Sequence, residues 1–309
     1  MSIVVIGSIN TDLTIQVPHF AAANETVLGR GDFATTQGGK GANQAIAAAA
    51  GGLQVHMLGK VGDDAFGEAA IEELLAAGVQ CDRVTREQSH STGVAAIFVD
   101  PAGNNSITVA PGANACVSAD DIRAASDLIA AASIVMLQLE IPTEAVTEAI
   151  RIGNKHGTRI MLDPAPATET LPDLSGISFL TPNEVEAEFL TGIQPSSREA
   201  AEQIGAHFKQ LGVSNVVLTL GENGCYVAGS DAAVMVETNK VRVVDSTGAG
   251  DAFNGFLATG LARGLGFVDA ARIACEVASL SVTRAGARSK LPAWEEAQSL
   301  KGRYGKETD

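Results

Sequence analysis

The sequence contains few cysteines and histidines, and their positions do not suit a zinc site or a disulfide framework. Cys81, Cys116, Cys225 and Cys275 are widely separated, without a C-x-x-C pair or a histidine at ligand spacing. The five histidines are equally scattered, and none has a partner in the sequence that would make it a catalytic base. We therefore expect buried thiols in a reducing compartment and no zinc centre.

Long hydrophobic runs and an excess of positive charge are also lacking. No apolar run is long enough to span a bilayer, and the formal net charge is −15. That charge argues against nucleic acid or an anionic membrane as the main partner, because their phosphates would be repelled on approach. Residues 1–7 lack the basic region and cleavage site of a signal peptide, so we expect a first strand there and a cytoplasmic protein.

Several common catalytic motifs are missing. Lys40 is followed by Gly41, so there is no P-loop of the NTPase type, and G-x-S-x-G and H-E-x-x-H do not occur. Residues 29–34 match the letters of a dinucleotide-binding fingerprint, but no helical pattern follows them, and we regard the match as chance. These familiar nucleotide-binding and hydrolase signatures therefore do not explain the chain.

The pattern that is present alternates short β-branched runs with longer amphipathic segments. Strands separated by helices of this length form right-handed crossovers, which predicts an α/β fold with a mainly parallel sheet covered on both faces. Ligands of such sheets bind beyond the carboxyl ends of the strands. The pattern predicts strands at 3–6, 55–60, 134–139, 159–162, 178–180 and 216–220, and helices at 41–50, 65–77, 119–132, 144–155, 183–190, 198–211, 249–262 and 268–283.

Two stretches interrupt this alternation. Residues 14–33 and 92–109 are β-like without a helical period, and the second contains turn-forming residues at 100–104. We expect them to form a small separate sheet over the main one, with an exposed apolar face of the kind that lids and dimer interfaces use. No repeat, charge block or linker divides the chain further, so we expect a single domain over 1–309 with a lid formed by about 12–36 and 91–111.

A glycine-rich turn near the C-terminal end precedes a strongly helical pattern. The N–H groups of the first helical turn, unobstructed at Gly248 and Gly250, would suit an anion such as a phosphate. Asp251 stands in that first turn, where a carboxylate can be a catalytic group or can merely compensate the helix dipole. The turn alone does not separate these two interpretations.

Polar residues also follow other predicted strands. Asn10 and Asp12 come directly after the first strand, Glu140 follows the strand at 134–139, and the glycine-rich residues 38–43 open the next helix. Each of these can have a purely structural role in a turn or a first helical turn. Together, however, their donors and acceptors suit a polyhydroxylated ligand.

A second set of residues suits a nucleotide. Asn183 and Glu186 lie one helical turn apart, a spacing that could hold a hydrated Mg²⁺ beside phosphates, although Glu186 can equally form a surface pair. Thr219, Gly221 and Gly224 belong to a turn that ends a strand, where glycines let a purine or a phosphate approach the backbone.

The stretches at 38–45 and 245–253 closely resemble the two signatures of the ribokinase-like (PfkB) carbohydrate kinases. Stretches 7–12, 138–140, 181–184 and 219–221 resemble further motifs of that family in the same order, so the resemblance covers about residues 3–292. It implies a three-layer αβα sandwich with a mainly parallel sheet and a small β-sheet lid. It also implies ATP-dependent phosphorylation of a sugar hydroxyl, with ribose as the leading acceptor.

The resemblance assigns roles to individual residues. Asp251 would be the catalytic base, and the N–H groups of Gly248, Ala249 and Gly250 would stabilise the charge of the transferring phosphoryl group. The residues that would hold the sugar are Asn10, Asp12, Gly39, Lys40, Gly41, Asn43, Glu140 and Asp251. Those that would bind ATP are Asn183, Glu186, Thr219, Gly221, Gly224 and Gly250. Glu186 would also hold Mg²⁺ through a water molecule.

The family also implies a monovalent cation, usually K⁺, and a second subunit. The cation ligands here would be Asp245, Thr247, Ser281, Arg284 and Gly286, mostly through backbone oxygens. Lys290 departs from the family, which tends to have serine at this position, and we expect weakened activation by K⁺. The lid would cover the sugar, exclude water and pair with the lid of a second subunit in a homodimer.

Two classes of function stay open at this point. Within the enzyme class, 2-deoxyribokinase, fructokinase and nucleoside kinase are alternatives, because the sugar-contact motifs do not fix the 2-position or the ring type. The other class is a non-catalytic sugar- or nucleotide-binding regulator on the same fold. The intact Asp251, Gly248 and Gly250 favour the kinase, since a binder has no need of the base.

Overall fold

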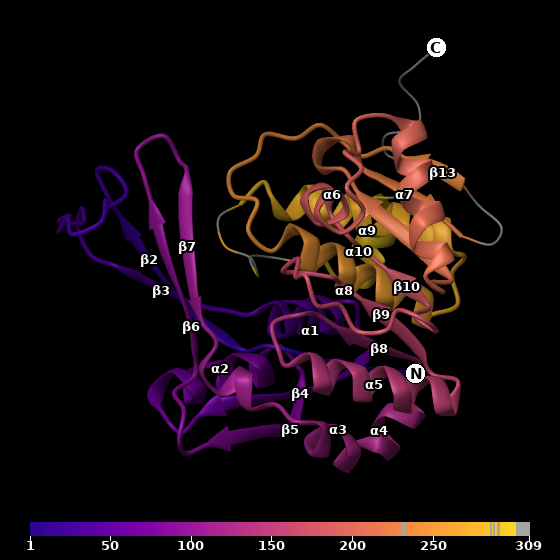
Figure 1. Cartoon of the computed structure of the whole chain (residues 1–309), viewed down its shortest axis with the longest axis horizontal. Helices are drawn as coiled ribbons and strands as arrows, with labels where there is room; N and C mark the ends of the chain where they lie inside the picture. Colours follow the sequence, from indigo (N-terminus) through magenta and orange to yellow (C-terminus); the bar gives the residue numbers. More distant parts are fainter. Residues whose placement is uncertain (230–232, 285, 287, 289–290, 301–309) are drawn as a thin grey trace.

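A nine-stranded sheet with helices on both faces forms the main body of the protein (Figure 1). The structure is a computed structural model and describes residues 1–229, 233–284, 286, 288 and 291–300. The strands of this sheet are β1 (Ser2–Ile6), β4 (Gln54–Gly62), β5 (Gln80–Glu87), β8 (Ile134–Leu137), β9 (Arg159–Leu162), β10 (Phe179–Leu180), β11 (Asn215–Thr219), β12 (Cys225–Ala228) and β13 (Ala233–Val236). Their order in the sheet is β13-β12-β11-β10-β9-β8-β1-β4-β5.

The point where the strand order reverses lies between β1 and β8. From β1 the chain moves outward to β4 and β5 on one side, and it later returns to β8 on the other side, with β1 and β8 parallel. Ile6 is in register with Leu137, so the loops that follow these two strands leave the sheet side by side. In an open parallel sheet this reversal opens a crevice beyond the carboxyl ends of the strands, which is where ligands bind.

Two hydrophobic cores sandwich the sheet, and alternate residues of β1 show the division. Ile3 and Val5 pack into one core, whereas Val4 and Ile6 pack into the other, as expected from the two-residue period of a strand. The first core contains residues of α1 (Lys40–Ala50), α2 (Ala65–Ala76), α8 (Ala249–Ala262), α9 (Phe267–Ser281) and α10 (Trp294–Leu300), and the second contains residues of α3 (Ala119–Ala124), α4 (Ser126–Ala131), α5 (Thr143–His156), α6 (Glu184–Thr191) and α7 (Arg198–Gln210). Among the described residues no helix is both long and apolar enough to cross a membrane.

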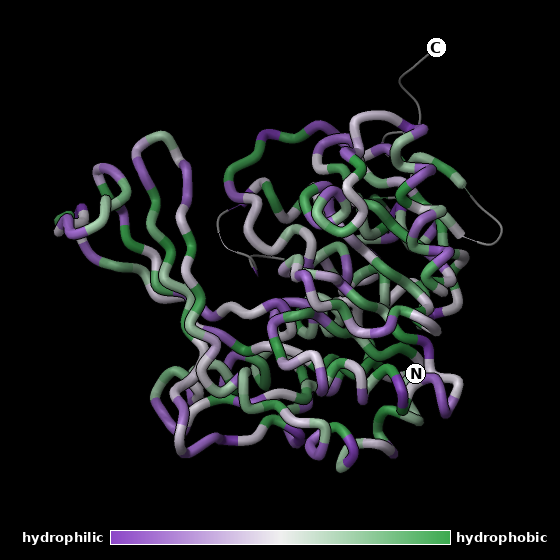
Figure 2. The backbone as a smooth tube through the Cα atoms, in the orientation of Figure 1, coloured by the Kyte–Doolittle hydropathy of each residue, from purple (hydrophilic) through white to green (hydrophobic). Residues whose placement is uncertain are grey.

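A second sheet projects from the main body (Figure 1), and its strand β2 begins four residues after the end of β1. It has four strands in the order β3-β2-β6-β7, namely β3 (Ala34–Gly38), β2 (Asn10–Gln16), β6 (Gly93–Val99) and β7 (Asn105–Ala110). Figure 2 shows hydrophobic and hydrophilic stretches following one another along this projecting sheet. The two expected β-like stretches thus contribute a small sheet, while its role as a lid stays a prediction.

Several expected elements differ from the structure. The helix expected at 119–132 is two helices, because Ala125 leaves the helical region at φ −105°, ψ 13°. The strand expected at 134–139 ends at Leu137. Of the first irregular stretch, 14–33, only residues 14–16 lie in a strand, the end of β2, and β3 begins directly after the stretch. Strands β5, β12 and β13 and helix α10 were not expected. In β5 polar and charged residues outnumber apolar ones, as suits the edge of a sheet, and β12 and β13 form an antiparallel hairpin.

Candidate active site

Glu140, in the loop after β8, connects the loop after β1 with the start of α1. The hydroxyl of Ser8 donates to Glu140 Oε2 at 2.5 Å, and the backbone N–H of Lys40 donates to the same oxygen at 3.1 Å. The chain comes very close at Gly41, where an added Cβ would lie 2.7 Å from backbone atoms of Gly7 and Ser8. Glycine at this position therefore lets the N-terminus of α1 reach the crevice between β1 and β8.

Asn10 and Asp12 lie on strand β2, not in a turn after the first strand. Asn10 Oδ1 accepts a hydrogen bond from Asn114 Nδ2 at 2.6 Å. The Asp12 carboxylate fills the space beside Gly38, where a Cβ would lie 2.3 Å from each of its oxygens. Burial raises the pKa of Asp12 to about 6; Arg288 opposes this rise, and nearby Glu140 adds to it.

Asp251 lies in the first turn of α8 and is only 6% exposed, so its carboxylate is not a surface group that compensates a helix dipole. Asn43 Nδ2 donates to Asp251 Oδ2 at 2.9 Å, and Gln44 Nε2 donates to Asp251 Oδ1 at 3.1 Å. Burial raises the pKa of Asp251, while Lys40 and these two amides oppose the rise. The arrangement leaves lone pairs on both oxygens for a further donor, which is what a base toward a hydroxyl group needs.

An amide network behind Asp251 was not predicted from the sequence. Gln44 Nε2 also donates to Asp163 Oδ2 at 2.8 Å, and Gln138 Nε2 donates to Gln44 Oε1 at 2.7 Å. All three side chains are buried, and burial raises the pKa of Asp163 well above its usual range. Gln44 lies inside the stretch 38–45 and Gln138 inside the stretch 138–140, both of which resemble family motifs, whereas Asp163 lies in none of these stretches.

Lys40 places a positive charge among the carboxylates. Burial alone would lower its pKa, but Asp163, Asp251, Glu140 and Glu186 together raise the pKa above its usual value. The side chain therefore stays protonated at neutral pH and partly balances the acidic groups. The charge of Lys40 would also attract an anionic group such as a phosphate.

A cavity of about 460 Å³ lies next to this acidic region and reaches the first turn of α8. Ala249 and Gly250 form one end of it, and an added Cβ at Gly250 would meet no atom within 4 Å. The Ala249 N–H donates to the carbonyl oxygen of Ser246 at 3.2 Å, which engages one of the three N–H groups expected to bind phosphate. The expected nucleotide residues Asn183, Thr219, Gly221, Gly224 and Gly250 all line the cavity, and so do the unexpected Thr238, Asn239, Val241, Val243, Ser246 and Phe253.

Asn183 and Glu186 form a capping box at the start of α6. Asn183 Oδ1 accepts from the Glu186 N–H at 2.8 Å, and Glu186 Oε2 accepts from the Asn183 N–H at 2.8 Å. This accounts for their spacing structurally, since the two side chains cap the helix. Burial raises the pKa of Glu186, while the bonds from Asn183 and the charge of Lys40 oppose the rise.

The segments expected to hold a monovalent cation lie side by side. Asp245 Oδ1 accepts from the Thr247 N–H and Oδ2 from the Gly286 N–H, both at 2.9 Å. The carbonyl oxygen of Ser281 accepts the Arg284 N–H at 3.3 Å. Lys290 lies outside the described residues. Within the described part of the chain no cluster of three or more His, Cys, Asp or Glu side chains could hold a metal ion.

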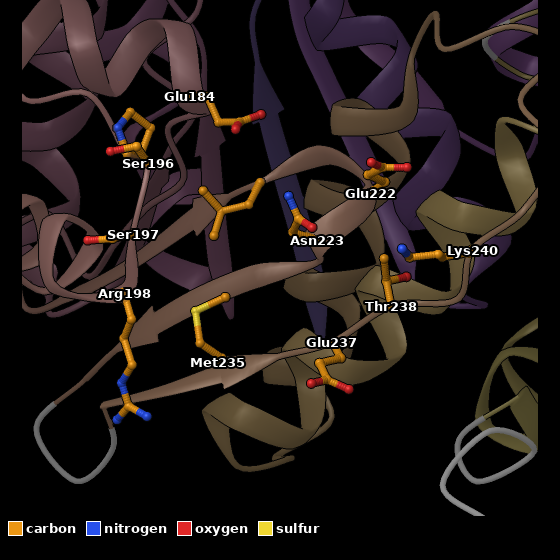
Figure 3. Close-up of a pocket in the computed structure, with 12 residues that line it drawn as sticks. Glu184, Ser196, Ser197, Arg198, Glu222, Asn223, Met235, Glu237, Thr238 and Lys240 are labelled. Atoms are coloured by element: carbon orange, nitrogen blue, oxygen red, sulfur yellow. The ribbon is translucent and has the colours of Figure 1, made fainter. Parts of the chain in front are cut away.

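A second hollow of about 620 Å³ lies beside the cavity of about 460 Å³ and was not expected (Figure 3). The two share Glu184, Glu222 and Thr238, so the turn after β11 lies between them. Figure 3 shows Asn223 and Met235 in the middle of this hollow and charged side chains around it, among them Arg198 and Lys240.

Comparison with known proteins places this fold and site in one family. A family model described as pfkB family carbohydrate kinase matches residues 1–294, and the chain belongs to that family. The protein is therefore an ATP-dependent carbohydrate kinase, which confirms the fold class and the family expected from the sequence.

Individual relatives of the chain are named as kinases of ribose or deoxyribose. A ribokinase of Haemophilus influenzae is 36% identical over 297 residues, which cover 96% of both chains. A deoxyribokinase of Salmonella typhi is 38% identical over 300 residues, covering 96% of this chain and 97% of the relative. The solved structure of Arabidopsis thaliana ribokinase complexed with ribose and ATP has a TM-score of 0.88 and 31% identity, covering 96% of this chain and 97% of the other.

Proposed function

We propose that the protein transfers the γ-phosphate of ATP to ribose and forms ribose 5-phosphate. One observation carries this proposal: Gly250 forms the end of the nucleotide cavity, and the next residue, Asp251, faces Asn43 and Gln44 on the sugar side. In this proposal the phosphate donor and the sugar acceptor meet at the first turn of α8. The ribokinase names of several relatives, one of them solved with ribose and ATP, support ribose as the acceptor.

Asp251 is the base in this proposal and takes the proton of the attacking hydroxyl group. Its raised pKa makes it a better proton acceptor than an exposed aspartate. The N–H groups at Gly248 and Gly250, joined by that of Ala249 when it turns from the Ser246 carbonyl, would stabilise charge on the phosphoryl group. Phosphoryl transfer depends mainly on such positioning and electrostatic help. The sugar would lie among Asn10, Asp12, Gly39, Lys40, Gly41, Asn43 and Glu140, which surround the crevice end of α1.

The nucleotide would occupy the cavity of about 460 Å³, with its phosphates toward Gly250. Asn183, Thr219, Gly221 and Gly224 line this cavity and would contact the nucleotide. ATP as the donor also supports the cytoplasmic location expected from the sequence.

Two cations complete the proposal. Glu186 would hold Mg²⁺ through water; one lone pair of each carboxylate oxygen is used by Asn183, and the remaining ones suit a water molecule. K⁺ would lie near Asp245, Thr247, Ser281, Arg284 and Gly286, mostly against backbone carbonyl oxygens; each Asp245 oxygen accepts one N–H and keeps a lone pair for the cation. When bound, Mg²⁺ would neutralise phosphate charge. We expect turnover to require Mg²⁺ and to rise with K⁺, and equal rates in K⁺ and in tetramethylammonium would contradict the K⁺ site.

An assay of ADP release with ribose, 2-deoxyribose, fructose and adenosine tests the acceptor. We expect the highest kcat/KM with ribose, and the deoxyribokinase relative makes 2-deoxyribose the second candidate. A preference for fructose or adenosine would replace the ribose assignment with fructokinase or nucleoside kinase. Binding of a sugar or ATP without any turnover would favour the non-catalytic regulator.

We also propose that the four-stranded sheet is a lid over the sugar and the contact surface of a homodimer. Large hydrophobic side chains are exposed on its strands and loops, with Leu28 84%, Phe33 62% and Ile107 53% exposed. An apolar surface of this kind is typical of protein–protein contacts.

Leu28→Asp combined with Ile107→Asp should raise the dissociation constant of the dimer by about tenfold or more. Both side chains would be buried on dimer formation, and the substitution would place charges there. Sedimentation velocity over a range of protein concentrations measures the effect. Leu211→Asp is the control, because Leu211 is 45% exposed at the end of α7, outside the lid. A native protein that is monomeric at all concentrations would contradict the proposal.

A further inference from the structure

Arg288 was not singled out in the sequence, yet its side chain is only 10% exposed and reaches the active site. Its guanidinium contacts three separate elements. Nε donates to Asn43 Oδ1 at 2.7 Å, Nη2 donates to the carbonyl oxygen of Gly38 at 2.9 Å, and Nη1 donates to Glu73 Oε1 at 2.8 Å. Arg288 thereby joins α1, the end of strand β3 and α2.

The contact with Asn43 determines which way its amide group points. A guanidinium group can only donate hydrogen bonds, and an ionised carboxylate can only accept them. Asn43 lies between the two, so its oxygen must face Arg288 and its NH₂ group must face Asp251 Oδ2, at 2.9 Å. The opposite orientation would place donor against donor and acceptor against acceptor.

We propose that Arg288 is a positioning residue for phosphoryl transfer, which fixes Asn43 so that its amide holds the Asp251 carboxylate in place and ties this arrangement to the lid at Gly38. The inference rests on the proposed role of Asp251 as the base. Arg288 does not contact the base itself and acts through Asn43. Its charge also faces Asp12, which lies against Gly38.

A double-mutant cycle between Arg288 and Asn43 tests the proposal. Arg288→Met should lower kcat with ribose by about tenfold to a hundredfold, the range for losing a hydrogen bond from a charged group, and leave KM for ATP within about twofold. Asn43→Ala should lower kcat as well, and the double variant should be little worse than Asn43→Ala alone because both remove the same support.

Glu73→Gln is the matched control, because Glu73 is the guanidinium partner farther from the site and is 42% exposed. If Arg288 only anchored the loop to α2, this variant would cost as much activity as Arg288→Met; we expect less than a threefold change. Arg288→Lys keeps the charge but not the planar set of donors, so its kcat should lie between those of the native protein and Arg288→Met. It also serves as the second variant of the cycle if Arg288→Met does not fold.

The proposal would be overturned if the double variant lost kcat by the product of the two single-variant losses, so that their activation free energies added. A native kcat in Arg288→Met would overturn it as well. The role of Asp251 is tested separately by Asp251→Asn. If that variant is inactive while the cycle is additive, only the role of Arg288 fails. If Asp251→Asn keeps native activity, the proposed base fails, and the positioning role fails with it.

Discussion

Replacing Asp251 with asparagine is expected to lower kcat by ~10²–10⁴-fold, the range for removing a general base, while ATP still binds. The amide has nearly the same shape but cannot accept the hydroxyl proton. The nucleotide cavity is lined by Gly250 and by residues of other elements, and the side chain of Asp251 is not part of its lining, so the affinity for ATP should change little. Steady-state kinetics with ribose and calorimetric titration with a non-hydrolysable ATP analogue measure the two quantities.

The control for this variant is Asp269→Asn. Asp269 is also an acidic residue in the first turn of a helix, α9, but it is exposed and lies outside the cavity and the acidic region. It therefore tests the alternative that a carboxylate at such a position only compensates the helix dipole. Equal effects of the two substitutions on kcat would remove Asp251 from the mechanism.

Replacing Gly250 with valine should lower kcat/KM for ATP by ~10²-fold or more while leaving the stability of the free protein nearly unchanged. An added Cβ at Gly250 meets no atom within 4 Å, so the β-carbon of the new side chain meets open space in the folded chain. The same side chain would fill the end of the cavity where the phosphates are proposed to approach the helix N-terminus. The expected loss of kcat/KM is of the order measured when an enzyme loses one hydrogen-bond donor of an anion hole.

Gly266→Val provides the matched control for this substitution. Gly266 precedes α9, its φ of −60° suits any residue, and an added Cβ there also meets no atom within 4 Å. Thermal melts should show similar small changes for both variants, and only Gly250→Val should lose activity. A Gly250→Val enzyme with native kcat/KM for ATP would show that the phosphates do not lie against the first turn of α8.

The parts of the site that are local in sequence could be predicted from it. Glycines followed by a helical period located α8 at its observed bounds, Ala249–Ala262, and placed the start of α1 to within one residue. Both helices begin where the chain has no side chain to obstruct approach, and this property is visible in a short window of sequence.

The parts that depend on contacts between distant residues could not be predicted. Gln44 meets Asp163 and Gln138 across about a hundred residues of sequence, and no spacing or period connects them. Arg288 is likewise linked to Asn43 only by the fold. Asn183 and Glu186 are close in sequence, and their spacing was interpreted as a pattern that could hold Mg²⁺. The structure shows that the same spacing also builds a helix cap, so a local pattern can be detected and still have more than one cause.

The central claim is that one turn of α8 brings ATP and a sugar hydroxyl together for direct transfer. Phosphorus NMR of a reaction containing ATP, Mg²⁺, K⁺ and ribose tests it most directly, because the spectrum separates a sugar phosphomonoester from inorganic phosphate. We predict one equivalent of ribose 5-phosphate for each ADP with the native protein and almost none with Asp251→Asn. Release of inorganic phosphate in place of the sugar phosphate, or equal product formation by both proteins, would contradict the account.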